Sequence, residues 1–410
     1  MEFIYINENS SVAIQLAEDG KNVEKVFIDG KEHVFDEKDK ADKRAFAIKT
    51  KRNKYQRFLN NQFENLLILT GAGSSAGVGV NEIKGRLLAE LWDDTREELG
   101  EEKLKMFCEL VRYTDKKDGK YVKNLEKLLS VANAAKDFIE STAQINIADT
   151  IIKIQSLIEE KCKLTLPDDA PHRVFLERIT TRKVTLPRVK IFTLNYDTLF
   201  EQAGRRGNFT IIDGFSFTFP RSFSGRNFDY DIVLRDKSRL KEEDNFISRV
   251  FHLYKPHGSV DWEKTEEGIK QSDKVKTSLM IYPKDSKYES SYEQPFFEMM
   301  SRFQQNLRKD NVLLICIGFS FNDKHIVTAI QEALEQNPGF QLMVVNKGID
   351  LSEGYKWLYR LANQHSNIVL IDELFSDFAS NYPMLKAYNQ DEYKKLIINL
   401  AESDGEKKPV

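Results

Sequence analysis

The chain has 410 residues, of which 41% are hydrophobic and 11% aromatic, enough to fill one sizeable core and a smaller one. Its 61 basic and 64 acidic side chains nearly balance, which argues against a general electrostatic attraction to nucleic acid. The three cysteines are far apart and form no C-x-x-C pair, so we expect neither a disulfide framework nor a metal site. The first residues resemble no signal peptide and no long apolar run follows, which predicts a cytoplasmic protein.

The chain begins with short aromatic-rich runs separated by the turn signals "EDGKN" and "DGK". This pattern is typical of hairpins and predicts a small β appendage over residues 1–42. A helical, basic segment follows between Lys43 and Asn60. We interpret it as a solvated helix face rather than a nucleic-acid surface.

The apolar run "LLIL" next enters the glycine cluster "TGAGSSAGVG", residues 70–79. A strand that ends in such a cluster can deliver a pyrophosphate to a backbone turn. The spacing from Gly71 to Gly77 is G-x-G-x-x-x-G and lacks the Gly-Lys-Ser/Thr ending of a P-loop, which disfavours an ATPase or kinase. The alternative is that the glycine cluster is a purely structural turn between a strand and a helix and binds no pyrophosphate.

Amphipathic helical segments then predict an inserted helical lobe over residues of about 83–185. Beyond it, three apolar runs each end in a polar cluster: "VKIFTL" before Asn195, "NVLLICI" before Gly318, and "FQLMVV" before Asn346. In an open α/β sheet the ligand crevice lies beyond the carboxyl ends of the strands. We therefore expect these clusters to meet the glycine turn in a Rossmann-like parallel sheet.

The sequence has six histidines. His33, His172 and His365 are interpreted as surface or capping residues without a role. His257 differs, because it follows an extended run in "FHLYKPHGSVDW" and lies on a turn, where a general base is well placed.

Together, "LTGAGSSAGVG", "FTLNYDTLFE", "YKPHGSVDW", "GFSFNDKHI" and "VVNKG" resemble the sirtuin-like superfamily, in particular its branch in bacterial antiphage defence. The resemblance covers roughly residues 62–347. It implies a sirtuin-like Rossmann domain over residues 43–350, followed by a C-terminal helical segment over residues 351–410.

The resemblance also implies roles for individual residues. Asn195 and His257 would be catalytic. NAD, as substrate, would contact the glycine turn, the Asn-Tyr-Asp segment and the later strand ends, that is Gly71, Ala72, Gly73, Ser74, Asp197, Gly318, Ser320, Asn322 and Asn346. Asp197 is equally compatible with capping the next helix, and Asp323 and His325 are interpreted as helix-start residues.

The chain departs from deacylating sirtuins in two respects: it has no zinc module and no acidic-aromatic-arginine segment after the glycine turn. By resemblance to the defence branch, we expect an NAD⁺ glycohydrolase that releases nicotinamide and ADP-ribose. The alternatives are an NAD-dependent protein deacylase and an NAD- or ADP-ribose-sensing subunit of a DNA-processing complex. The same resemblance implies a homo-oligomer and a HerA-type ATPase as partner. An insertion at residues 215–250 has no assigned role.

Overall fold

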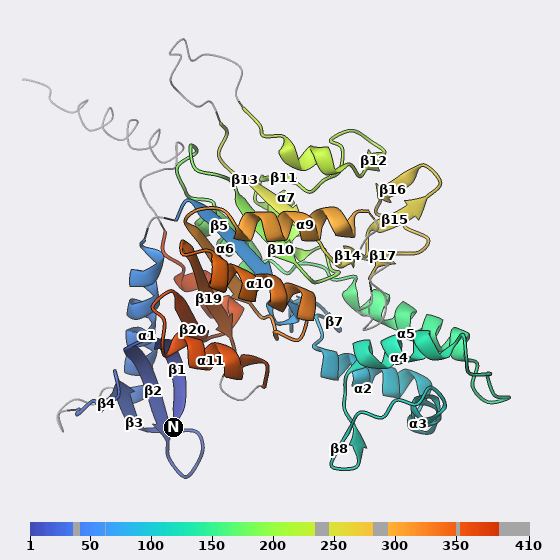
Figure 1. Cartoon of the computed structure of the whole chain (residues 1–410), viewed down its shortest axis with the longest axis horizontal. Coiled ribbons are helices and arrows are strands. Elements are labelled where there is room, and N and C mark those ends of the chain that lie inside the picture. Colours follow the sequence, from blue (N-terminus) through green and yellow to red (C-terminus); the bar gives the residue numbers. More distant parts are fainter. Residues whose placement is uncertain (36–41, 62, 234–245, 282–293, 350–352, 385–410) are drawn as a thin grey trace, which may run out of the picture.

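The computed structural model describes residues 1–35, 42–61, 63–233, 246–281, 294–349 and 353–384. One eleven-stranded sheet organises this part of the chain, in the order β11-β13-β10-β5-β18-β19-β20-β1-β2-β3-β4 (Figure 1). The strands from β11 to β20 pair in parallel, and β1 to β4 continue the sheet antiparallel. Their bounds are β1 Glu2–Asn7, β2 Ser10–Leu16, β3 Val23–Ile28, β4 Lys31–Glu32, β5 Asn65–Thr70, β10 Val189–Thr193, β11 Thr210–Ile212, β13 Val250–Tyr254, β18 Val312–Ile317, β19 Phe340–Asn346 and β20 Ile368–Asp372.

The central strands form because their side chains are apolar on both faces. Every residue of β5 and of β18 is buried, as expected for parallel strands covered by helices on both sides. The predicted strands at "LLIL", "VKIFTL", "NVLLICI" and "FQLMVV" are all confirmed. The fold is therefore a mixed α/β, Rossmann-like sheet.

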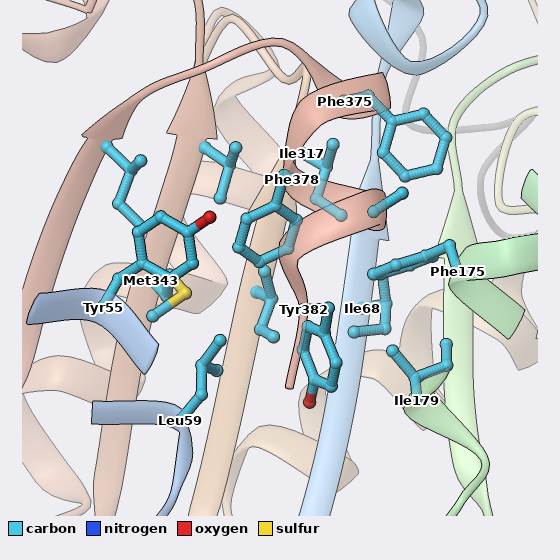
Figure 2. Packing of buried hydrophobic residues seen from close by; sticks show 14 of the residues in the cluster. Tyr55, Leu59, Ile68, Phe175, Ile179, Ile317, Met343, Phe375, Phe378 and Tyr382 are labelled. Carbon is cyan, nitrogen blue, oxygen red and sulfur yellow. The ribbon is translucent and has the colours of Figure 1, made fainter. Parts of the chain in front are cut away.

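Helices cover both faces of the parallel part of the sheet. One face packs against α1 (Lys43–Leu59), α6 (Pro171–Ile179), α7 (Leu199–Arg206) and α12 (Phe375–Asn381). Figure 2 shows the aromatic centre of this layer, where Phe175, Phe375 and Phe378 lie over Ile68 and Ile317. The other face packs against α9 (Phe296–Leu307), α10 (Lys324–Gln336) and α11 (Lys356–Ala362).

The predicted helical lobe forms a separate core. Its helices are α2 (Leu88–Leu99), α3 (Glu101–Leu110), α4 (Leu125–Ala135) and α5 (Ile147–Cys162), and a hairpin joins α3 to α4 through β8 (Lys116–Lys117) and β9 (Lys120–Tyr121). These four helices bury their apolar faces against one another and lie to one side of the sheet (Figure 1). By contrast α6, which falls in the same predicted range, packs on the sheet.

β1 and β20, the first and last strands of the described chain, pair with each other in the sheet. β1 pairs with β20 through Tyr5 and Ile371, so the N-terminal strands extend the main sheet. β20 was not predicted, because the segment after residue 350 was expected to be helical. Residues 385–410 of that segment lie outside the described residues.

The interpretation of His172 as a surface or capping residue is wrong. Its side chain is fully buried in the first turn of α6, where its ring packs against Phe200 and Phe375. Neither ring nitrogen has a hydrogen-bond partner. Burial among these aromatic rings lowers the pKa of His172 to about 3.

The basic residues of α1 largely bind other parts of the fold. Lys51 donates to the Asp372 carbonyl at 2.8 Å, and Arg52 reaches Glu373 at 3.2 Å. Lys54 pairs with Asp29 at 2.8 Å. These contacts fasten α1 to the rest of the fold. The predicted solvated face is therefore wrong for Lys51, which is buried.

Short strands and turns surround the carboxyl ends of the parallel strands. They are β6 (Gly79–Val80), β7 (Ile83–Lys84), β12 (Arg221–Ser222), β14 (Gly258–Ser259), β15 (Trp262–Thr265), β16 (Gly268–Gln271) and β17 (Leu279–Met280), with 3-10 turns at η1 (Ala72–Ser74), η2 (Gly225–Asp229) and η3 (Glu353–Tyr355). The insertion predicted at 215–250 contributes β12 and η2, and its residues 234–245 lie outside the described residues. Within the described ranges, no helix is both long and apolar enough to span a bilayer, and no group of three or more His, Cys, Asp or Glu side chains is arranged to hold a metal ion.

Candidate functional site

The polar clusters follow five adjacent strands of the sheet. In the order β13, β10, β5, β18 and β19, the strands lead into His257, Asn195, the glycine turn, Gly318 and Asn346. The chain continues from β5 to β10 on one side and later to β18 on the other, so β5 is the topological switch point of the sheet. Ligands of open α/β sheets bind at this position. The structure thus brings the predicted segments to one edge.

The glycine turn after β5 packs directly on the turn after β18. A Cβ atom on Gly71 or on Gly73 would come within 2.8 or 2.7 Å of the Gly318 backbone, so side chains are excluded at both positions. Gly318 itself has φ of 62°, a left-handed conformation that favours glycine. These three glycines are therefore required by the close approach of two backbones.

Three backbone N–H groups of the glycine turn have protein partners. Gly71 donates to Ile317 at 3.0 Å, Gly73 to Gly318 at 2.9 Å, and Ser74 to the Gly71 carbonyl at 2.9 Å. The turn leads into a three-residue 3-10 helix, and the next α-helix begins at Leu88. The turn differs in this respect from a long helix that offers free N–H groups to a phosphate, and its contact with pyrophosphate stays a prediction.

Asn195 holds the glycine turn from the neighbouring strand. Its Nδ2 lies 3.0 Å from the Gly71 carbonyl, 3.1 Å from Ser74 Oγ and 2.8 Å from Ser75 Oγ. Among the described residues its Oδ1 accepts no hydrogen bond, and the side chain is half-buried. Asn195 is therefore fixed in orientation with its carbonyl oxygen left for a ligand.

Asp197 is buried and serves the protein backbone. Its Oδ2 accepts from Ser75 Oγ at 2.7 Å, and its Oδ1 accepts from the Leu199 N–H at 3.0 Å. The second bond satisfies the N–H of the first residue of α7, whose N-cap is Thr198. Asp197 thus ties the glycine turn to α7, and direct contact with a ligand is a separate prediction.

Lys255 fastens the Asn195 turn to the His257 turn. Its fully buried Nζ donates to Ser259 Oγ at 2.8 Å, to Glu201 Oε1 at 3.0 Å and to the Asp197 carbonyl. Burial disfavours the cation, but Glu201, Asp261 and Asp197 outweigh it, and the pKa of Lys255 is raised. Burial likewise raises the pKa of Glu201, to about 7. Lys255 was not predicted as a site residue, although a charged residue directly after the apolar run "FHLY" is a signal for it.

His257 lies at the end of β13 and faces a carboxylate from across the sheet. Its Nε2 is 3.1 Å from Asp323 Oδ2, and 18% of the His257 side chain is exposed. Burial lowers the pKa of His257, but the bond to Asp323 and the charges of Asp323 and Glu126 raise it, and the net change is upward. The same pair lowers the pKa of Asp323 to about 2 against the effect of burial. The two shifts agree in favouring an imidazolium–carboxylate pair.

The predicted residues after β18 and at the end of β19 differ in exposure and in their contacts. Ser320 and Asn322 are exposed on the turn after β18. Asn346 is engaged within the protein, because its Nδ2 contacts Tyr355 Oη and its Oδ1 accepts from Lys347 N at 3.0 Å. Tyr355 in turn donates to the Phe319 carbonyl at 2.5 Å, so Asn346 helps to hold the turn after β18.

Two cavities were resolved away from this edge. One, of about 430 Å³, lies in the helical lobe between Met106 and Ile145. The other, of about 180 Å³, lies between Arg182 and Arg249, near the amino ends of β10 and β13. Neither is lined by a predicted site residue.

Comparison with known proteins gives one family match. Residues 189–356 match a family model described as a SIR2-like domain. None of the curated proteins compared with the chain matches it. The match includes the turns after β10, β13, β18 and β19, and it leaves out the glycine turn after β5.

Several solved structures show a weak overall likeness. A Sir2 homolog–NAD complex has 15% identity and a TM-score of 0.37, covering 80% of this chain and 91% of its own. A mutant Sir2 homologue in complex with ADP-ribose has 14% identity and a TM-score of 0.35, covering 86% and 99%. A structure described under the mechanism and regulation of Sir2 enzymes has 12% identity and a TM-score of 0.36, covering 81% and 96%. Scores of this size support no conclusion about this chain, and the positive finding is the SIR2-like match over residues 189–356.

Proposed function

We propose that this protein is an NAD⁺ glycohydrolase that cleaves NAD to nicotinamide and ADP-ribose. The observation that carries the proposal is that Asn195 and His257 follow adjacent parallel strands, β10 and β13, beside the switch point and within the segment that matches a SIR2-like domain.

The chemistry requires little beyond these two side chains. Nicotinamide is a good leaving group, so cleavage of the N-glycosidic bond mainly needs stabilisation of an oxocarbenium-like ribose and a positioned water. Asn195 is held by the glycine turn and presents Oδ1 to a ribose hydroxyl or to that water. His257, once deprotonated, accepts the proton of the water as it attacks C1 of the ribose.

The predicted binding residues divide into two groups in this proposal. Those on exposed or half-buried turns contact NAD directly, namely Ala72, Ser320 and Asn322. Those that pack against the protein shape the turns, namely Gly71, Gly73, Ser74, Asp197, Gly318 and Asn346.

The test is release of nicotinamide and ADP-ribose from NAD by the purified full chain, without any acylated peptide. We expect Asn195→Ala and His257→Ala to abolish release while His365→Ala, at an exposed position, retains it. Because Asn195 also holds the glycine turn through Nδ2, Asn195→Asp serves as a second variant: it keeps Oδ1 for the ligand and loses the donor to Gly71, so it measures the structural part of the loss. Thermal unfolding of each variant confirms that it is folded. Full turnover in both alanine variants would refute the assignment.

The same assay separates the two alternatives. A deacylase requires an acyl-lysine peptide for nicotinamide release, and a sensing subunit binds ADP-ribose tightly without turnover. The proposed hydrolase needs neither condition.

The biological setting that we propose is a cytoplasmic, regulated effector of antiphage defence that depletes NAD. It rests on the resemblance of the five motifs, which also suggests a homo-oligomer controlled by a HerA-type ATPase. Size-exclusion chromatography of the protein alone and with its genomic neighbour tests this. A monomer that hydrolyses NAD without restraint would contradict control by assembly.

A further inference from the structure

We propose that Asp323 is the positioning residue of His257, holding its Nε2 so that the neutral ring presents Nδ1 as the proton-accepting nitrogen. This inference deepens the proposed function and rests on it. From the sequence, Asp323 was interpreted only as a residue at the start of a helix.

The Asp323 carboxylate is fixed from both sides. Its Oδ1 accepts from the N–H groups of His325 at 2.9 Å and Ile326 at 3.2 Å, which makes Asp323 the N-cap of α10. Its Oδ2 lies 3.1 Å from His257 Nε2. One carboxylate therefore couples the direction of the imidazole ring to the end of a thirteen-residue helix.

The carboxylate also determines the tautomer of the neutral His257 ring. An ionised carboxylate can only accept hydrogen bonds, so the Nε2 that faces it must carry the proton. In the neutral ring the lone pair is then on Nδ1, which has no hydrogen-bond partner among the described residues. Asp323 thus decides which nitrogen can act as the base.

The contact between His257 and Asp323 joins the turns after two strands that are not neighbours in the sheet. His257 follows β13 and Asp323 follows β18, and β10 and β5 lie between these two strands. The bond therefore bridges the turns from both sides of the switch point, above the strand ends that lead to Asn195 and the glycine turn. A ligand at this edge would lie beside the bridge.

Other charged groups near the pair come from three elements. Glu126, in the first turn of α4, interacts with both His257 and Asp323 and brings the helical lobe to the site. His325 in α10 interacts with Asp323. Lys255, on the same turn as His257, is bound by Glu201, Ser259 and the Asp197 carbonyl instead.

The experiment uses two variants that keep the helix cap. Asn and Ser are both good N-caps, so Asp323→Asn and Asp323→Ser retain the start of α10 while removing the negative charge beside His257. Asp42→Ser is the matched control: Asp42 caps α1 by accepting from Arg44 and Ala45, and it takes no part in the site.

The readout is the ¹⁵N NMR spectrum of full-length protein labelled at its six histidines, recorded across pH, with His257→Gln to assign the signal. We expect the native His257 to carry its neutral-state proton on Nε2. In both Asp323 variants its pKa should fall by about one pH unit or more, as removal of an adjacent opposite charge predicts. Asp42→Ser should change neither property. An unchanged pKa and tautomer in both Asp323 variants would overturn the inference.

Activity provides a second readout. In the variants, the acidic limb of the kcat/KM profile for nicotinamide release should move to lower pH together with the NMR pKa, and kcat should fall more than KM changes. A fall in activity with the limb unmoved would mean that Asp323 acts only as a cap, and would count against the proposal. The NMR titration needs no turnover, so absence of NAD cleavage in the native protein would refute the hydrolase and leave the histidine–aspartate pairing to be judged separately.

Discussion

The dipeptide Pro-His occurs twice in this chain, at 171–172 and at 256–257, with opposite results. At the start of α6 the ring of His172 is fully buried among aromatic side chains and has no hydrogen-bond partner. At the end of β13 the ring of His257 is partly exposed and bonded to Asp323. The pKa of His172 is lowered to about 3, whereas that of His257 is raised.

The difference comes from the neighbouring segments rather than from the dipeptide. Ala170 precedes the first pair and is the buried N-cap of α6, whereas Lys255 precedes the second pair and anchors its turn to the Asn195 turn. A histidine suited to proton transfer therefore needs a charged partner and access to solvent, and burial without a partner removes its charge.

The largest expected effect is on kcat for nicotinamide release, and it distinguishes His257 from His172. Under the proposed mechanism, His257→Ala should lower kcat for nicotinamide release by about a hundredfold to ten-thousandfold, because the general base is lost. His172→Leu should leave kcat at pH 8 nearly unchanged. Steady-state assays of the two purified variants measure both, and equal losses would erase the functional distinction.

The next effect concerns Lys255, which precedes the Pro-His pair at 256–257. Lys255→Met should lower the free energy of unfolding by about 3–5 kcal/mol, because Glu201 is then buried without its cation and must take up a proton to fold at pH 8. Urea denaturation at pH 8 measures this loss. The double variant Glu201→Leu/Lys255→Met should regain part of it, since both charges are then absent. A loss below about 1 kcal/mol in the single variant would show that the pair does not anchor the turn.

His172 should make the folded state sensitive to acid. Its pKa is about 3 when folded, below the ordinary 6.5, so its contribution to stability is present above pH 6.5 and is lost as pH falls toward 3. At pH 5 the expected loss is about 2 kcal/mol relative to pH 8. Urea denaturation of His172→Leu at both pH values should show a smaller difference than the native protein, and an equal difference would refute the burial argument.

The smallest effect lies one residue further along α6. Arg173 is 3.7 Å from Glu177, and 52% of the Arg173 side chain is exposed. Arg173→Ala should therefore change the free energy of unfolding by less than about 0.5 kcal/mol. Thermal unfolding of this variant beside His172→Leu tests whether the sensitivity belongs to the buried ring alone. A larger change would indicate that this end of α6 is strained.

The parallel strands and their polar ends could be predicted because long apolar runs and the residues that follow them are local signals. The pairing of β1 with β20 joins residues at opposite ends of the described chain, and no local pattern encodes it. His172 was misinterpreted because a proline in a first helical turn says nothing about which face is buried. The contact of His257 with Asp323 likewise depends on the order of strands in space.

The two outer strands of the large sheet have a consequence for self-association. β4 spans two residues, Lys31 and Glu32, both exposed and charged, and β11 at the opposite border spans three. Such short borders offer few unpaired backbone groups to another chain, which protects against strand addition and fibre growth. If copies of this protein assemble, we expect them to join through side-chain surfaces, and the sheet of each copy to end where it ends in the monomer.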